Sequence, residues 1–325
     1  MKKEYNIEDL CQRFKQKDKI ALARLITLVE NNPNSAEEIF THLNNTSNES
    51  YIIGVTGSPG VGKSTLTGKL TEKIIEEGKS VGIISIDPSS PFSGGAFLGD
   101  RVRMKEITIH PNVFMRSLAS RGYKGGVSRA VFDISLLYEA YGMDVILIET
   151  VGVGQSEFDI YNLAYTVVVM LAPNMGDAIQ MQKAGIIETA DIYDVNKKDL
   201  GGEDLVVQIE MMLDDATSSQ SGWRPPVVMT NSASGEGIDI LLEKIWDHKE
   251  YLELSELIKT RKTQRYIYKI KASMIDRIES ILLKNLFNNE ELDDLASNLL
   301  DNQFDIYRNL EEMFNKVHFS LKKDA

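Results

Sequence analysis

Short runs of apolar residues alternate with amphipathic stretches through the middle of the chain. The apolar runs are too short for helices and predict buried strands; they cover residues 51–56, 81–86, 145–148 and 167–171, with 191–195 as a further candidate. Between the first two runs, Ser64 to Glu77 places Leu66, Leu70 and Ile74 on one helical face. Buried strands that alternate with helices are typical of an α/β fold with a mostly parallel sheet flanked by helices.

Both ends of the chain carry helical patterns instead of strands. Near the N-terminus, residues 19–30 have apolar side chains at helical spacing, and Ser35 to Glu38 has the form of a capping box. After Leu254, apolar stripes of the helical kind continue to the end. We therefore predict an N-terminal helical lead-in at 1–49, an α/β domain at 50–253 and a C-terminal helical extension at 254–325.

A glycine-rich run follows the first predicted strand and opens the first helix of the α/β domain. The run is Gly57-Ser58-Pro59-Gly60-Val61-Gly62-Lys63-Ser64, which fits G-x-x-x-x-G-K-[ST]. In such a P-loop, backbone NH groups surround a phosphate, the lysine neutralises the β and γ charges, and the serine hydroxyl reaches Mg²⁺. The helix N-terminus adds its dipole. We predict nucleotide binding by residues Gly57, Ser58, Pro59, Gly60, Val61, Gly62, Lys63, Ser64 and Thr65.

A second motif points to guanine. Asn196-Lys197-Lys198-Asp199 fits N-K-x-D, in which Asp199 can accept hydrogen bonds from the ring NH and exocyclic amine of guanine, whereas adenine offers no such pair of donors. The motif follows a predicted strand, at the end where α/β sheets bind ligands. One residue fits poorly: Asp194 lies inside that strand, so either it faces a polar edge or the strand is short. The two motifs together predict GTP and GDP as ligands.

Composition indicates the cellular location of the protein and the kind of partner it binds. The 325 residues carry a formal charge of −12 with a pI of about 5.0, and no apolar run is long enough to cross a bilayer. No basic stripe is visible, so we expect neither nucleic acid nor a membrane as the partner. The N-terminus has no apolar leader, and the single cysteine, Cys11, excludes a disulfide within the chain. We expect a cytoplasmic protein whose partner is another protein.

Acidic residues end several of the predicted strands. Asp87 and Glu149 each follow an apolar run, and Asp100 lies in a glycine-rich loop beside Arg101. Asp87 and Asp100 are candidate metal ligands, and the run that begins at Glu149 has the form of a γ-phosphate sensor. Each has an ordinary alternative, because a strand-end carboxylate can simply cap the next helix. After Glu149, Gly152 offers its NH to a γ-phosphate. Gln155 is a candidate for positioning the water, although it lies three residues beyond Gly152 instead of immediately after it.

Taken together, these motifs resemble the MeaB/ArgK (MMAA-like) group of metallochaperone-type P-loop GTPases. The resemblance rests on the P-loop, the guanine motif and three further segments, namely Asp87 to Gly95, Leu98 to Arg101 and Glu149 to Gln155. It implies a GTPase that gates adenosylcobalamin loading into, and protects, a cobalamin-dependent acyl-CoA mutase, most often methylmalonyl-CoA mutase. It also implies a homodimer joined through the C-terminal helices.

The resemblance further implies roles for individual residues. Ser64, Asp87, Asp100 and Glu149 would surround Mg²⁺, and Lys63, Glu149, Gln155 and Lys183 would form the catalytic set. Lys183 lies in a predicted switch, Gly176 to Lys183, that would respond to the mutase. Thr230 to Ala233 is an imperfect version of the last base-contacting loop, in which Ser232 is the candidate contact.

Three other functions remain open from the sequence. Nickel-insertion GTPases share the glutamate at position 149, but they usually carry clustered metal ligands, whereas this chain has four scattered histidines, His42, His110, His248 and His318. Similar proteins have also been described as lysine/arginine/ornithine transport kinases, which would need an acceptor hydroxyl and a base. A GTP-gated scaffold without hydrolysis is the third alternative.

Overall fold

The computed structural model describes residues 6–43, 49–87, 105–119, 126–150, 156–173, 190–215 and 222–285, together with Ser297 and Glu311. The chain divides into two compact units, 1–268 and 269–325. Of the second unit, the described part is chiefly the later half of one helix, α12, which begins in the first unit. The fold that follows is that of the first unit.

Three short helices precede the sheet: α1 (Ile7–Lys15), α2 (Lys19–Asn31) and α3 (Pro33–His42). The predicted apolar stripe of α2 is buried, and Asp18 caps this helix by accepting from two backbone NH groups. The predicted capping box at Ser35 is wrong, because α3 already begins at Pro33 and Ser35 lies inside it. Proline suits the first helical position, where its missing NH would have no intrahelical partner.

Seven strands form one sheet in the order β3-β2-β4-β1-β5-β6-β7, and every neighbouring pair is parallel. Their bounds are β1 Tyr51–Gly57, β2 Val81–Asp87, β3 Val113–Ala119, β4 Val145–Glu149, β5 Thr166–Leu171, β6 Ile192–Val195 and β7 Val227–Met229. The parallel sheet confirms the predicted fold class. It also brings the carboxyl ends of strands that are far apart in sequence to one edge.

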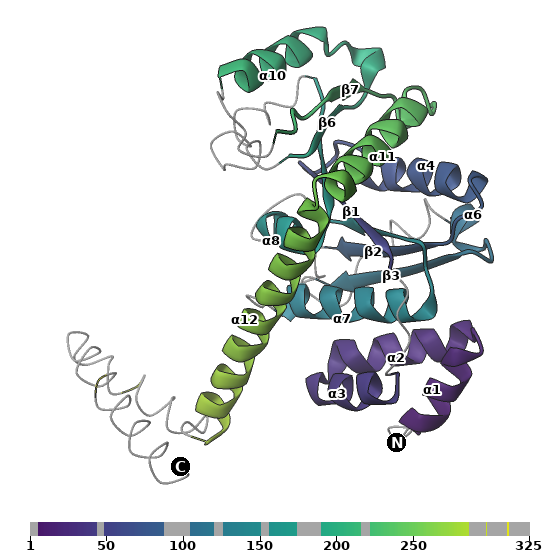
Figure 1. Ribbon diagram of the computed structural model, residues 1–325, viewed down its shortest axis with the longest axis vertical. Coiled ribbons are helices and arrows are strands. Elements are labelled where there is room, and N and C mark those ends of the chain that lie inside the picture. The colour runs from purple at the N-terminus through teal and green to yellow at the C-terminus, as the bar shows by residue number, and fades with distance from the viewer. Residues whose placement is uncertain are drawn as a thin grey trace. The chain divides into compact units, whose positions relative to one another are not determined.

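Helices cover both faces of this sheet (Figure 1). On one side, α4 (Lys63–Glu76) packs against the central strands and α11 (Ile238–Leu254) packs against α4 and β5. On the other side, α7 (Gly126–Tyr141) contacts β2, and α8 (Ser156–Leu163) contacts β1. The remaining described helices are α6 (Lys105–Thr108), η2 (Lys198–Leu200), α10 (Glu203–Asp215) and α12 (Leu257–Asn285).

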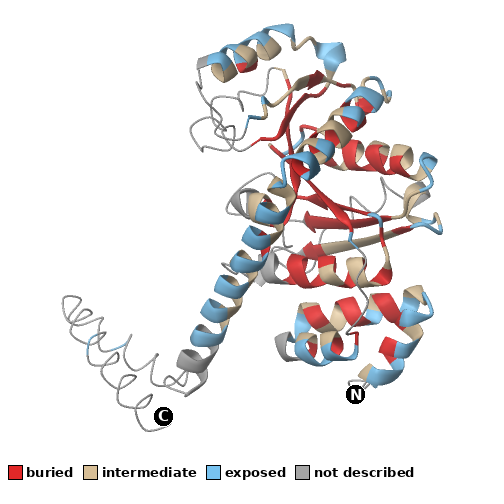
Figure 2. Ribbon diagram, in the orientation of Figure 1, coloured by how far each residue is buried: buried red, intermediate tan, exposed pale blue. Residues whose placement is uncertain are grey.

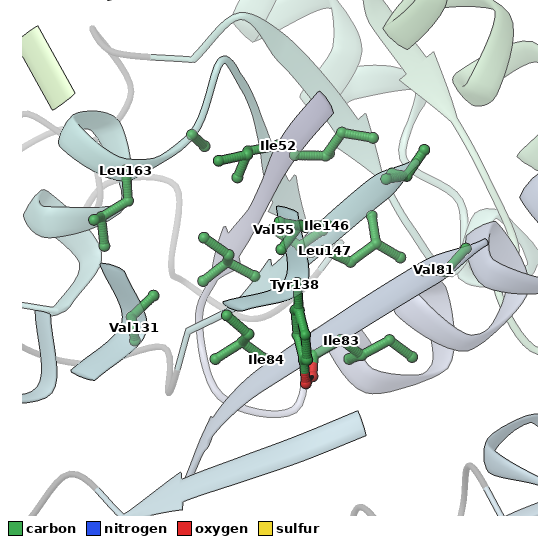
Figure 3. Packing of buried hydrophobic residues seen from close by; sticks show 14 of the residues in the cluster. Ile52, Val55, Val81, Ile83, Ile84, Val131, Tyr138, Ile146, Leu147 and Leu163 are labelled. Atoms are coloured by element: carbon green, nitrogen blue, oxygen red, sulfur yellow. Dashed lines mark hydrogen bonds between the residues drawn. The ribbon is translucent and has the colours of Figure 1, made fainter. Parts of the chain in front are cut away.

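The core is a continuous layer of aliphatic side chains between sheet and helices. Figure 3 shows Tyr138 of α7 beside Ile83 and Ile84 of β2, and the Tyr138 hydroxyl donates to the Ile83 carbonyl at 3.1 Å. This packing explains Gly82, since a Cβ there would lie 2.4 Å from the Tyr138 ring. The apolar runs of the central strands are therefore buried on both faces, as a parallel sheet requires.

A buried polar cluster closes the amino-terminal edge of the sheet. Asp191 accepts from Val167 N at 2.8 Å and from Arg261 of α12 at 2.7 Å. His248 of α11 lies 2.8 Å from the Thr166 hydroxyl, and burial lowers its pKa, an effect that Asp191 opposes. The cluster fixes α11 and the start of α12 to the sheet.

A second arginine, Arg265, anchors the start of α12 to α7. It is buried and donates to the Ser135 hydroxyl at 2.5 Å, contacts Glu139 at 2.9 Å and lies over the Phe132 ring. Farther along the same helix the surface is open to solvent (Figure 2). Exposed apolar side chains there are Ile270, Met274, Ile275 and Ile278.

Candidate functional site

The P-loop lies between β1 and α4 with its lysine folded back on it. Lys63 Nζ donates to the carbonyl oxygens of Gly57 at 2.7 Å and Ser58 at 3.0 Å, and the side chain is almost fully buried. Gly57 and Gly62 both have positive φ, which glycine adopts without strain. The strand, loop and helix therefore stand in the arrangement that an anion site needs, with the ammonium group already within the loop.

The first residue after that lysine meets the end of another strand. Ser64 Oγ donates to Glu149 Oε1 at 2.6 Å, and Glu149 is buried at the carboxyl end of β4. The next residue, Thr150, shares a hydrogen bond of 2.9 Å with Thr56 of β1. The first turn of α4 and the carboxyl end of β4 therefore bring a hydroxyl and a carboxylate oxygen together next to the P-loop. Such oxygens are the ligands that Mg²⁺ prefers in proteins.

The guanine motif follows β6 and contacts the P-loop directly. Asn196 Nδ2 donates to the Val61 carbonyl at 2.7 Å, and Lys197 Nζ donates to the Gly60 carbonyl at 2.9 Å. Gly62 lies so close that a Cβ there would be 2.4 Å from Asn196 Nδ2. The absence of a side chain at Gly62 therefore serves the contact between the two motifs as well as the turn.

The loop after β7 contacts two of the three polar residues that N-K-x-D supplies, Asn196 and Asp199. Asn196 Oδ1 accepts from Ser232 N at 2.9 Å and from Ser232 Oγ at 3.0 Å. Asp199 Oδ1 accepts from Asn231 Nδ2 at 2.8 Å. Asn231 is itself fixed by a pair of contacts to the backbone NH groups of the next turn. The candidate base-reading carboxylate of Asp199 therefore has a preset orientation.

Asp194 does not face a polar edge, which was one of the two possibilities for this residue. It is completely buried in β6, a strand of four residues, and Thr230 Oγ1 donates to its Oδ1 at 2.6 Å. Burial raises the pKa of Asp194 to about 7, and the Thr230 hydrogen bond opposes that rise. The strand is short, and its acid lies directly behind the guanine motif.

The comparisons with known proteins agree on one family. A family model described as methylmalonyl Co-A mutase-associated GTPase MeaB matches residues 22–287. The chain belongs to this family. The matched range includes the P-loop, Glu149, the guanine motif and all of α12.

Two archaeal GTPases are similar to this MeaB-family chain over most of their length. One, from Pyrococcus abyssi, is 46% identical over 268 residues, which cover 82% of this chain and 83% of that protein. The other, from Pyrococcus horikoshii, is 40% identical over 314 residues, which cover 96% of this chain and 98% of that protein. The family and these relatives establish a guanine-nucleotide-binding GTPase, which confirms the predicted enzyme class.

A solved structure described as LAO/AO transport system kinase has a similar fold. The TM-score is 0.70 at 25% identity, and the match covers 97% of this chain and 99% of that one. In the described part of the chain, no helix of this MeaB-family GTPase is long and apolar enough to cross a membrane.

Several predicted site residues fall outside the described residues: Asp100, Gly152, Gln155 and Lys183. Asp87 ends β2, where its backbone pairs with Ala119 of β3, and its side chain is not described. Of the predicted set, the structure brings together the P-loop, Glu149, Asn196, Lys197, Asp199 and Ser232.

Sequence reasoning placed Thr230 and Asn231 in the base-contacting loop of this MeaB-family site but assigned neither of them a contact. Thr230 lies between Asp194 and Asn196, and Asn231 orients Asp199. Both belong to the imperfect base-contacting loop, so the departure of this loop from the usual pattern was the available signal. Their partners are set by the pairing of β6 with β7, which no local pattern reveals.

Proposed function

We propose that this MeaB-family GTPase gates adenosylcobalamin loading into a cobalamin-dependent acyl-CoA mutase and protects that mutase, with methylmalonyl-CoA mutase as the partner. The observation that carries the proposal is the family match, whose description names association with methylmalonyl-CoA mutase. The match spans the described nucleotide-site residues and all of α12, so the same family features that bind nucleotide are present in this chain.

The proposed chemistry is in-line attack of water on the γ-phosphorus of GTP. The bond between that phosphorus and the β–γ bridging oxygen breaks, and GDP and phosphate leave. Lys63 neutralises charge on the phosphates after exchanging its two carbonyl partners for phosphate oxygens.

The residues fit a bound Mg²⁺. Ser64 Oγ and Glu149 Oε1 lie 2.6 Å apart, and we propose that these two, with Asp87 and Asp100, hold the ion. When bound, Mg²⁺ would offset negative charge on the phosphate oxygens. The protein contributes by fixing these two oxygen ligands, at the end of β4 and directly after the P-loop lysine, before nucleotide binds.

Guanine recognition would use the N-K-x-D side chains and the loop after β7. Asp199 would accept from the guanine ring NH and amine, while Asn196 and Lys197 hold the P-loop against the base site. Gly152 and Gln155 would serve the γ-phosphate and the water, and Lys183 would transmit the response to the mutase.

We also propose that two copies of the chain pair through α12. Ile270, Met274 and Ile278 repeat at helical spacing along one stripe, and each is more than half exposed. A second copy offers a stripe of the same kind, so an isologous contact would cover both. Replacing Ile270 and Met274 by glutamate should shift the mass in analytical ultracentrifugation from dimer to monomer. Unchanged mass would overturn this part of the proposal.

The mutase proposal is tested by GTP hydrolysis with and without purified methylmalonyl-CoA mutase. Native protein alone should turn over slowly, mutase should raise the rate, and Lys183→Ala should lose that rise. Lys259→Ala, a change of an exposed lysine on α12, is the matched control and should keep it. An ATP arm tests the transport-kinase alternative. Unchanged turnover with a competent mutase would reject the proposed partner.

A further inference from the structure

A buried acid lies behind the guanine motif, and no proposed chemical step uses it. Asp194 and Asn196 are two residues apart on one extended segment, so their side chains point to the same face. Both contact the same hydroxyl: Thr230 Oγ1 lies 2.6 Å from Asp194 Oδ1 and 3.2 Å from Asn196 Oδ1. Thr230 therefore connects the acid to the guanine motif.

The single hydrogen of the Thr230 hydroxyl decides which neighbour it serves. A hydroxyl donates one hydrogen bond, so Thr230 can donate to Asp194 Oδ1 or to Asn196 Oδ1, and not to both at once. If Asp194 is ionised, it is an acceptor only, and the hydroxyl hydrogen is drawn to the charged group at the shorter distance. Asn196 Oδ1 then keeps only its two contacts from Ser232.

Protonation of Asp194 reverses the direction of this hydrogen bond. Asp194 Oδ2 has no hydrogen-bond partner among the described residues, so a proton there would have no acceptor. A proton on Oδ1 has Thr230 Oγ1 at 2.6 Å. The acid then donates to Thr230, and the Thr230 hydrogen is free for Asn196. The neutral acid is thus the form in which Thr230 adds a third hydrogen bond to Asn196 Oδ1, beside the two from Ser232.

The surroundings of Asp194 favour the neutral form. The residues paired with it on β5 and β7 are Met170 and Val228, which are apolar. The other charged groups on this segment are engaged elsewhere: Asp191 with Arg261, Lys197 with the Gly60 carbonyl, Lys198 with Glu236, and Asp199 with Asn231. Burial raises the pKa of Asp194 to about 7, and the charged side chains around the motif are not among the causes of this shift. The acid therefore titrates near neutral pH.

We infer that Asp194 is a positioning residue for guanine-nucleotide binding, acting as a neutral acid that orders Asn196 through Thr230 and releases it on ionisation. This inference rests on the proposed guanine role of Asn196. Asn196 also donates to the Val61 carbonyl, so a well-positioned Asn196 side chain also fixes the position of the P-loop backbone. The nucleotide affinity of the protein then depends on pH through a residue that does not touch the nucleotide.

The test is the Kd for GDP, measured by calorimetry between about pH 5.5 and pH 8.5 for native protein and Asp194→Asn. The amide is uncharged at every pH and can donate to Thr230. The phosphates of GDP titrate equally in both experiments. The ratio of the two Kd values at each pH therefore reports the contribution of Asp194 ionisation to GDP affinity. Native affinity should fall about fivefold relative to the variant as pH rises, which corresponds to one lost hydrogen bond.

Two changes at Thr230 separate positioning from a merely structural effect. Thr230→Val keeps the shape but removes the hydroxyl, so affinity should be low at every pH and the pH step should vanish. Thr230→Ser keeps the hydroxyl and should restore the step. If Asp194→Asn and Thr230→Val retain the native pH dependence, the inference is overturned. Because mutase is absent from this experiment, failure of mutase activation would leave a positive result standing.

The proposed base site and the inference fail in different ways. No GDP binding by native protein at any pH would overturn both together. Tight GDP binding with the same pH dependence in native protein and Asp194→Asn would overturn the inference alone. If Asp194→Asn does not fold, the comparison of Thr230→Val with Thr230→Ser decides the question, since each of these changes leaves the acid in place.

Discussion

Asn196 Nδ2 donates to the Val61 carbonyl at 2.7 Å, across 135 residues of sequence. This contact makes the guanine motif part of the wall of the P-loop. Each motif therefore depends on the other for its geometry, and a substitution in either motif should alter the structure of both.

Replacing Asn196 by alanine should weaken both folding and GDP binding. The change leaves the Val61 carbonyl without this donor and the Ser232 NH without its acceptor, in a buried setting. We expect a loss of about 2–3 kcal/mol in unfolding free energy, measured by urea denaturation, and weaker GDP binding. Asn31→Ala is the control, since Asn31 is exposed and only contacts its own helix. Equal effects of the two changes would contradict this prediction.

The contribution of Asp194 to the stability of the protein should fall as pH rises from about 4 to about 7. In this range Asp194 of the unfolded chain, with its ordinary pKa of 3.8, is ionised, while burial raises the folded pKa to about 7 and keeps the folded acid protonated. The folded state therefore binds more protons, and its advantage disappears with rising pH. The loss amounts to at most about 4 kcal/mol.

Asp194→Asn should lack this component of the pH dependence. Urea denaturation at several pH values measures it, with native protein and the variant compared at each pH. Above pH 7 the variant should be the more stable protein. Parallel stability curves for the two proteins would show that the buried acid is not neutral in the folded state.

Glu149→Gln should raise the Mg²⁺ concentration that GTP hydrolysis requires. The neutral amide keeps the size of the side chain but removes the negative charge that faces Ser64 Oγ at 2.6 Å. We expect turnover to fall by about 100-fold, with a higher Mg²⁺ midpoint in a titration at saturating GTP. Glu72→Gln on the surface of α4 is the control. A native Mg²⁺ midpoint in Glu149→Gln would remove Glu149 from the proposed metal site.

Asp199→Asn should exchange guanine for xanthine selectivity. Guanine presents an amine beside its ring NH, whereas xanthine presents a carbonyl there, which an amide NH can satisfy. Competition of GDP and xanthosine diphosphate for a fluorescent nucleotide measures the change. Unaltered base preference in Asp199→Asn would place base recognition elsewhere.

Asn231→Ala should weaken GDP binding by a few-fold, because it removes the donor that orients Asp199.

Arg265→Ala should destabilise the first unit by about 3 kcal/mol, because Glu139, whose side chain is only 16% exposed, would lose its guanidinium partner. The raised pKa of Glu139, caused mainly by burial and opposed by Arg265, would rise further. Arg224→Ala is a control: Arg224 contacts the carboxylates of Glu210 and Asp214 on the surface, and the loss of these contacts should cost little stability. Thermal unfolding of both variants compares the two sites, and a larger cost at Arg224 would refute the anchoring role of Arg265.

The sequence predicted the central strands because their apolar runs are buried on both faces. It missed β3, in which Arg116 interrupts the apolar pattern and pairs with Glu30 of α2, and β7, which has three residues. Within the site, the sequence placed the P-loop and the guanine motif at strand ends. The Asp194–Thr230–Asn196 arrangement escaped it, because that arrangement depends on the pairing of β6 with β7.

The separation of Asn196 from the P-loop along the chain has a consequence during synthesis. At roughly 5–20 residues per second, the ribosome adds the intervening 135 residues in about 7–27 s. During that interval the nascent chain contains the P-loop but not yet β6, the strand that places Asn196 against the P-loop. Discrimination between purine bases is thus a late property of the growing polypeptide.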